Sequence, residues 1–291
     1  MTSSLPAAIR VAAGELAAAG VASPRNDAEQ LAAHVLGVER TRLVVISVID
    51  AEPLAEYRAL IARRARRIPL QHLTGTAPMG RIDLAVGPGV FVPRPETELL
   101  FAWALADLES AGHGHPPVVV DLCTGSGALA LALAHAFPDA VVHAVELDPL
   151  AAQWAQRNAQ ARAERGDTPI MLHTADATDP ELLAELSGRV DLVVSNPPYI
   201  PAGAELEPEV ADHDPHAALF GGPDGLAVIA GLVPNIARLL RPGGAVGIEH
   251  DDSNGAGVAA LLRAHGFIEV AEHTDLAGKP RFVVARRRGE G

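Results

Sequence analysis

Four consecutive residues, Asn196-Pro197-Pro198-Tyr199, have the types and order expected of a binding site for a planar NH2 group. Asn196 offers a side-chain carbonyl, Pro197 a backbone carbonyl, and Tyr199 an aromatic face. A residue that precedes proline is restricted to extended backbone, so Asn196 should be held rigidly. We therefore interpret this segment as a clamp for an amide or amine. The simpler alternative is a strand that two prolines bring to an end.

A predicted buried strand positions the clamp. Residues 190–195 form a short apolar run rich in β-branched side chains, as is typical of a central parallel strand. The prolines end the ladder because they have no backbone N–H. Open α/β sheets bind ligands at the carboxyl ends of their strands. The clamp is thus expected at a ligand-binding edge.

A glycine-rich loop at residues 121–127 follows another predicted strand and opens a helix. Gly125, Gly127 and Ala130 match the dinucleotide-binding spacing G-x-G-x-x-A, and Glu146 ends the next strand about 20 residues later. Glycines let a ligand approach the backbone, and the helix N-terminus favours negative charge. The loop alone fits a nicotinamide cofactor and S-adenosylmethionine equally well, since both carry an adenosine with a 2′,3′-diol.

Three further features favour S-adenosylmethionine. Asp121 places a carboxylate near the ammonium or the water network of an amino-acid tail. Asp176 follows the third strand, where it can accept from an adenine amino group, although a solvated loop acid is the alternative. The clamp follows the fourth strand, where a methyl acceptor would stand. A dehydrogenase would need a hydride-relay acid or base, and the sequence offers no clear candidate for one. Cys123 has no base beside it in sequence, so packing against the cofactor is expected rather than nucleophilic catalysis.

The elements that must hold these residues alternate between strand and helix. Strands are predicted at residues 118–122, 140–146, 170–174, 191–195, 245–249, 268–273 and 282–285. Asp148-Pro149 is a good helix start, with an N-cap followed by proline. The alternation predicts an α/β fold with a doubly wound, mainly parallel sheet.

The sequence also divides into predicted domains. Residues 1–70 are predicted to be a helical domain with helices at 5–19, 27–36 and 54–67, residues 71–94 a linker with a β-hairpin, and residues 95–291 the catalytic domain. Residues 200–225 have no clear period, and loops of that length are usually functional or disordered.

Composition limits the classes of function. The chain has 291 residues and a net charge of −13, which argues against duplex nucleic acid as the main partner. The single cysteine indicates a reducing compartment. We identify no signal peptide or membrane span and expect a cytoplasmic protein. Residues 212–216 match no metal-site spacing, so no metal is predicted.

Nearly the whole chain resembles the bacterial peptide chain release factor N5-glutamine methyltransferases. The resembling segments are residues 69–75, 91–98, 121–127, 195–200, 218–226 and 275–281. Asn-Pro-Pro-Tyr alone is shared with enzymes that methylate exocyclic amines of nucleobases, whereas Pro93 to Glu98 with the helical domain is more specific. The resemblance implies a Rossmann-like class I S-adenosylmethionine-dependent methyltransferase that methylates the Gln of a Gly-Gly-Gln motif in release factors.

The resemblance also implies site residues. Catalysis is implied for Asn196, Pro197 and Tyr199, and substrate binding for these three together with Pro198. The implied cofactor site comprises Phe91, Arg94, Thr97, Asp121, Cys123, Thr124, Gly125, Ser126, Gly127, Glu146, Asp176, Ala177 and Asn196. The chain departs from the family pattern in four places: Glu146 replaces a frequent Asp, Ala177 a common aromatic residue, residues 213–215 a Tyr-Glu-Pro, and residues 249–252 a Glu-Ile-Gly-type stretch. The departures leave the adenine pocket and loop contacts open.

Two alternative functions remain: a nucleobase exocyclic-amine methyltransferase, and a nicotinamide-dependent dehydrogenase. For the leading function we expect a release factor as the protein substrate and a monomeric enzyme. A basic cluster at residues 63–67 is either a solvated helix face or a contact to the release factor or accompanying ribosomal RNA.

Overall fold

The computed structural model describes residues 2–112, 114–275 and 277–289. His113, and Leu276 of the resembling segment 275–281, lie outside these ranges. The chain divides into two compact units, one formed by Met1–Thr76 with Leu206–His213 and the other by Ala77–Glu205 with Asp214–Gly291. No helix in the described ranges combines the length and apolar character needed to cross a membrane.

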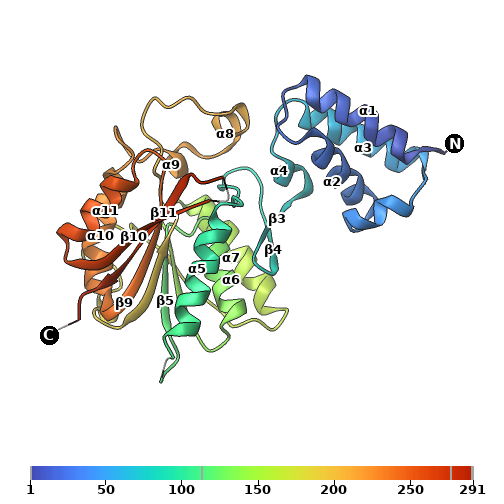
Figure 1. Cartoon of the computed structure of the whole chain (residues 1–291). Helices are drawn as coiled ribbons and strands as arrows, with labels where there is room; N and C mark the ends of the chain where they lie inside the picture. The colour runs from blue at the N-terminus through green and yellow to red at the C-terminus, as the bar shows by residue number, and fades with distance from the viewer. Residues whose placement is uncertain (1, 113, 276, 290–291) are drawn as a thin grey trace. The chain divides into compact units, whose positions relative to one another are not determined.

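The first unit is helical (Figure 1). Its elements are β1 (Ser3–Ser4), α1 (Leu5–Ala18), α2 (Pro24–Leu36), the 3-10 helix η1 (Arg40–Val45), β2 (Val48–Ile49), α3 (Ala51–Arg64), α4 (Leu70–Thr74) and α8 (Pro208–His213). The three predicted helices match α1, α2 and α3. Gly37 ends α2 in the left-handed conformation at φ 62°, which glycine adopts without strain.

Ion pairs inside this unit correct the expectation for the basic cluster. Arg64 is 4% exposed, and its guanidinium lies 2.8 Å from Asp27 and 2.9 Å from Glu209. Arg67 binds Glu209 at 2.8 Å and Glu207 at 2.9 Å. A solvated helix face is therefore wrong for Arg64. Because residues 206–213 belong to this unit, the two arginines hold part of the long segment that follows the clamp.

The second unit contains a seven-stranded sheet in the order β10-β11-β9-β8-β5-β6-β7. Its strands are β5 (Val118–Leu122), β6 (Val141–Glu146), β7 (Met171–Thr174), β8 (Val190–Ser195), β9 (Leu240–Glu249), β10 (Phe267–Thr274) and β11 (Pro280–Arg287). The strands from β9 to β7 are parallel, and β11 is antiparallel to both neighbours. The predicted doubly wound, mainly parallel sheet is confirmed.

Helices cover both faces of the sheet (Figure 1). On one face lie α5 (Thr97–Ser110), α6 (Ala128–Ala136) and α7 (Pro149–Ala163), and on the other lie α10 (Ala227–Leu239) and α11 (Gly255–Ala264). Each face of the sheet has its own hydrophobic core, and alternate residues of the central strands pack into one or the other. Leu192 and Val194 face α5 and α6, and Val193 faces α10. Asp148 caps α7 as predicted, because its Oδ1 accepts from the N–H groups of Leu150 and Ala151.

The unit also contains a two-stranded sheet of β3 (Thr76–Met79, beginning one residue before the unit) and β4 (Ile82–Ala85). The segment 200–225 is more ordered than its lack of periodicity indicated. It contains α8, the short helix α9 (His216–Leu219) and a parallel bridge between Ile200 and Phe220. A 3-10 helix, η2 (Ala184–Leu186), completes the elements of the described ranges.

Candidate active site

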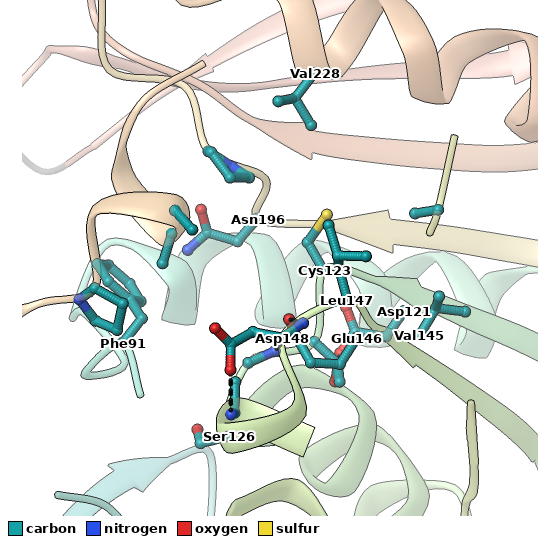
Figure 2. Close-up of a pocket in the computed structure, with 18 of the residues that line it drawn as sticks. Phe91, Asp121, Cys123, Ser126, Val145, Glu146, Leu147, Asp148, Asn196 and Val228 are labelled. Atoms are coloured by element: carbon teal, nitrogen blue, oxygen red, sulfur yellow. Dashed lines mark hydrogen bonds between the residues drawn. The ribbon is translucent and has the colours of Figure 1, made fainter. Parts of the chain in front are cut away.

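A cavity of about 420 Å³ opens at the carboxyl ends of β5, β6, β7 and β8 (Figure 2). Most of the predicted site residues line it: Phe91, Thr97, Asp121, Cys123, Thr124, Gly125, Ser126, Glu146, Asp176, Ala177, Asn196, Pro198 and Tyr199. Arg94, Gly127 and Pro197 are not among its lining residues. The cavity is in the size range of small-molecule sites, so the fold gathers both the glycine loop and the clamp around one ligand-sized space.

The glycine loop is shaped by left-handed backbone. Cys123, Gly125 and Gly127 have φ values of 63°, 57° and 85°. A Cβ on Gly125 would meet no atom within 4 Å, so its backbone is open to the cavity. A Cβ on Gly127 would lie 3.0 Å from Leu131, where α6 begins. The first glycine thus leaves room for a ligand, and the second allows the helix to pack closely.

Glu146 holds this loop in place. Its Oε2 accepts from the Gly125 N–H at 2.8 Å and its Oε1 from the Asp148 N–H at 2.9 Å. Burial raises the pKa of Glu146, while these backbone donors oppose the rise. Each carboxylate oxygen has a second lone pair, so the side chain can still accept the two hydroxyls of a ribose.

The surroundings of the Asp121 carboxyl indicate whether a cationic ligand fits the cavity. Its Oδ2 accepts from Thr124 Oγ1 at 2.5 Å and from the Ala130 N–H at 3.1 Å, whereas its buried Oδ1 has no hydrogen-bond partner among the described residues. Burial raises the pKa of Asp121 to about 7. A buried carboxylate without a counter-charge is costly. The site therefore fits a ligand that brings an ammonium or another donor.

Apolar side chains form the wall near Ala177, where an aromatic residue is absent. Leu147, Val228 and Leu232 line the same cavity, and the two residues of α10 belong to the apolar cluster around Ala177. Asn235 fixes the backbone there by donating to the carbonyls of Ala177 and Asp179. Sequence reasoning missed these walls, although Leu147 directly follows Glu146 and could have been found from that position.

Cys123 lines the cavity without the surroundings of a nucleophile. Burial, reinforced by Glu146 and Asp121, raises the pKa of its thiol. Because a thiolate is the reactive form, this environment keeps the side chain inert. Its contribution is then to the shape of the cavity, which agrees with the packing role expected from the sequence.

The clamp follows β8 and is supported from behind by close backbone packing. A Cβ on Gly225 would lie 2.1 Å from the Tyr199 carbonyl oxygen, and one on Gly221 would lie 2.6 Å from that of Pro198. Asn254 donates to the same Tyr199 carbonyl at 3.2 Å. Glycine is required at both positions because any side chain would displace the clamp.

Glu249, at the end of β9, is a site residue that sequence reasoning did not identify. Its Oε2 accepts from Thr97 Oγ1 at 2.8 Å and its Oε1 from the Tyr199 hydroxyl at 2.9 Å. Burial raises the pKa of Glu249 to about 7, although both hydrogen bonds oppose the rise. Burial, followed by the charge of Glu249, raises the pKa of Tyr199, so the phenol remains a neutral donor.

Arg94 lies behind one wall of the cavity. Its guanidinium carbon lies 5.1 Å from the centre of the Phe91 ring, and its Nη2 donates to Asp214. Phe91 itself lines the cavity (Figure 2). In this arrangement Arg94 supports Phe91 and anchors the chain before α9.

This sheet, with its glycine loop and a clamp after β8, defines a class I methyltransferase. Family models match the PrmC N-terminal domain over residues 7–75 and the methyltransferase small domain over residues 100–213. Two solved structures share the fold. The first is a Thermus thermophilus 16S rRNA N2 G1207 methyltransferase (TM-score 0.52, 24% identity, 73% of this chain and 50% of that chain). The second is a Pyrococcus furiosus methyltransferase (TM-score 0.51, 17% identity, 71% and 89%).

Relatives of higher identity specify the family. The release factor glutamine methyltransferase of Mycolicibacterium smegmatis is 56% identical over 284 residues, covering 97% of this chain and 98% of the relative. Those of Corynebacterium glutamicum and Streptomyces coelicolor are 51% and 48% identical, and each alignment covers at least 96% of both chains. The chain belongs to the release factor glutamine methyltransferase family.

Proposed function

We propose that this enzyme transfers the methyl group of S-adenosyl-L-methionine to the side-chain amide nitrogen (N5) of the glutamine in the Gly-Gly-Gln motif of peptide chain release factors. It would do so in the cytoplasm, as a monomer, and thereby support translation termination. The observation that carries the proposal is that one cavity is lined by Asp121, Glu146 and Asp176 and by three residues of the clamp, Asn196, Pro198 and Tyr199. Cofactor and acceptor can therefore meet without movement of the sheet.

The proposed cofactor site uses residues of three neighbouring strand ends. Asp121 would accept from the ammonium of the amino-acid tail, Glu146 from the ribose hydroxyls, and Asp176 from the adenine amino group. Asp176 Oδ1 already accepts from the Thr178 N–H at 2.8 Å and hydroxyl at 2.7 Å, which hold the carboxylate and lower its pKa. When bound, the cofactor supplies an electrophilic methyl group on a sulfonium.

The clamp supplies the other half of the reaction by positioning the acceptor. An amide nitrogen is a poor nucleophile because its lone pair is delocalised into the carbonyl. Alignment of the reacting groups can contribute about 7–11 kcal/mol to lowering the barrier. Asn196 Oδ1 and the Pro197 carbonyl would each accept one N–H of the acceptor amide. They would thereby orient its lone pair and stabilise the positive charge that develops on nitrogen.

Tyr199 would complete the acceptor site. Its ring is suited to contact the amide plane or the nitrogen as it becomes cationic. No side chain needs to remove a proton beforehand, because the methylated nitrogen loses its proton easily after transfer. Catalysis then rests on orientation and electrostatics.

Mapping the product tests the proposal. The enzyme is incubated with labelled S-adenosylmethionine and a purified release factor, and the methyl group is located by mass spectrometry. We expect one methyl group on the Gly-Gly-Gln glutamine and none on a release factor with that glutamine replaced by alanine. Incorporation elsewhere, or none at all, would refute the proposed substrate.

An Asn196→Ala variant then tests the clamp. We expect loss of methyl transfer, while the affinity for S-adenosylhomocysteine, measured by calorimetry, stays within about fivefold because orientation rather than cofactor binding is lost. Retained turnover in this variant would refute the role assigned to Asn196.

A further inference from the structure

We propose that Glu249 is a positioning residue, which acts through Thr97 to fix the orientation of the Asn196 amide and through the Tyr199 hydroxyl to fix its ring. Glu249 contacts neither the cavity nor, by this assignment, the substrate. The inference deepens the proposed function and rests on it for the meaning of the clamp. It concerns four residues from three separate segments of the sequence: Thr97, the clamp residues Asn196 and Tyr199, and Glu249.

The sheet places Glu249 beside the clamp. Strands β8 and β9 are parallel, and Ser195 pairs with Ile248, so the next residues along each strand are Asn196 and Glu249. Glu249 is 2% exposed and Thr97, at the start of α5, is 3% exposed. In so dry an environment each polar atom requires a partner, so the hydrogen-bond pattern is tightly specified.

The number of protons available in these hydrogen bonds determines which group donates and which accepts. In its ionised form, which the hydrogen bonds from Thr97 and Tyr199 favour, the Glu249 carboxylate only accepts, so Thr97 donates its one hydroxyl proton to Oε2. The Thr97 oxygen is then available only as an acceptor. Asn196 lies 3.2 Å from it and must present Nδ2, which donates. The opposite amide orientation would bring two acceptors together.

This hydrogen-bond direction leaves Oδ1 of Asn196 to bind the substrate amide that accepts the methyl group. With Nδ2 bound to Thr97, Oδ1 is the remaining end of the amide, and no hydrogen bond to Oδ1 occurs among the described residues. Asn196 lines the cavity, so Oδ1 can accept an N–H of a substrate amide. A reversed amide would present a donor to that NH2 group and repel it.

Tyr199 is held by the other oxygen of the same carboxylate. Its hydroxyl donates to Glu249 Oε1 at 2.9 Å, while its carbonyl is fixed by Asn254. One buried side chain therefore sets both the amide and the aromatic face of the clamp. The pair of hydroxyl donors also explains why a carboxylate is suited to this position: a glutamine has one acceptor atom where two are needed.

Two isosteric variants test the assignment. In Glu249→Gln the new NH2 group donates to Thr97 or Tyr199, and in Thr97→Val the hydroxyl is lost. We expect kcat for release-factor methylation to fall about 100-fold in each, with the KM for S-adenosylmethionine within about threefold, because orientation rather than cofactor binding is damaged. The double variant should fall no further than Glu249→Gln alone, since Thr97→Val removes a hydrogen bond that Glu249→Gln already disturbs.

Conservative and matched variants separate positioning from folding. Thr97→Ser restores the hydroxyl and should recover most of the kcat lost in Thr97→Val. Glu109→Gln changes an exposed carboxylate on the same helix, α5, and should behave as wild type in kcat and thermal unfolding. A kcat within threefold of wild type in Glu249→Gln or Thr97→Val, or multiplied losses in the double variant, would overturn the assignment.

A measurement without turnover distinguishes this inference from the proposed function. In 15N-labelled wild type, a side-chain N–H of Asn196, identified by its loss in Asn196→Ala, should exchange slowly with solvent because it is bound to Thr97. In Thr97→Val it should exchange at least about tenfold faster. Equal exchange would overturn the inference even if release factors are methylated. Failure of wild-type methylation with the exchange difference intact would count against the proposed substrate alone.

Discussion

Replacing Asp121 with asparagine should change how stability depends on pH. The Asp121 carboxyl is 1% exposed, and burial raises its pKa from the usual 3.8 to about 7. That difference corresponds to about 4 kcal/mol between the protonated and the ionised folded states. Asparagine has nearly the same shape, and its oxygen can still accept from Thr124, but it cannot ionise.

The sign follows from proton binding. Between pH 3.8 and 7 the folded protein holds the Asp121 proton more tightly than the unfolded chain does. The protonated carboxyl contributes stability that is fully present below pH 3.8, declines by about 1.4 kcal/mol per pH unit, and is lost above about pH 7. The asparagine variant lacks this decline, so it should gain stability relative to wild type as the pH rises.

Urea unfolding of both proteins between pH 5 and pH 8 measures the effect. Glu146 and Glu249 titrate in both proteins, so only the difference between the two free energies of unfolding is used. We expect that difference to change by about 3 kcal/mol in favour of the variant. A difference that stays constant across this range would refute the argument that Asp121 is protonated in the free enzyme.

Cofactor binding supplies a second measurement of the same group. An ammonium beside Oδ1 favours the ionised carboxylate, so binding at pH 6 should release close to one more proton in wild type than in Asp121→Asn. Calorimetry of S-adenosylhomocysteine in two buffers of different ionisation enthalpy measures that number. At pH 8.5 the two proteins should release the same number, and equal release at pH 6 would contradict the proposed contact.

Two further predictions concern the supports of the site. In Gly225→Ala the new Cβ would lie 2.1 Å from the Tyr199 carbonyl oxygen, so methyl transfer should fall at least about tenfold. The control Gly203→Ala shares a positive φ but has open space around the new Cβ, so it should lower the free energy of unfolding by only about 1 kcal/mol and keep activity. Equal behaviour of the two variants in unfolding and methylation assays would argue against the packing role of Gly225. Arg64→Met leaves Asp27 buried without its partner and should destabilise the protein by about 3–5 kcal/mol in urea unfolding, whereas the exposed Arg63→Met should change stability by less than about 0.5 kcal/mol; similar values would show that the buried pair is unimportant.

Much of the fold could be predicted from local sequence. Short β-branched runs marked the central strands β5, β6 and β8, because buried parallel strands have that composition over five or six residues. The clamp and the glycine loop were recognisable because each is contiguous and follows a strand directly. Their convergence on one edge then follows from the parallel direction of β5 and β8.

Segments whose structure depends on distant partners were not predicted. Residues 63–67 look like an exposed basic face, yet Arg64 is buried because Asp27 and Glu209 lie beside it. The segment 200–225 has no hydrophobic period, yet it contains two short helices because distant arginines hold it: Arg67 binds Glu207 and Glu209, and Arg94 binds Asp214. Charge and periodicity describe one stretch of chain, whereas burial depends on what packs against it.

The sequence alone determined the kind of chemistry: a glycine loop after the first strand, an acid at the end of the second, and Asn-Pro-Pro-Tyr after the fourth. It could not determine which end of the Asn196 amide faces the cavity. That orientation depends on Thr97 and Glu249, which are 152 residues apart and meet only because α5 packs against the parallel pair of β8 and β9. The tertiary structure decides it because a hydrogen-bond direction is set by every proton donor and acceptor in the buried network, and those groups come from separate elements.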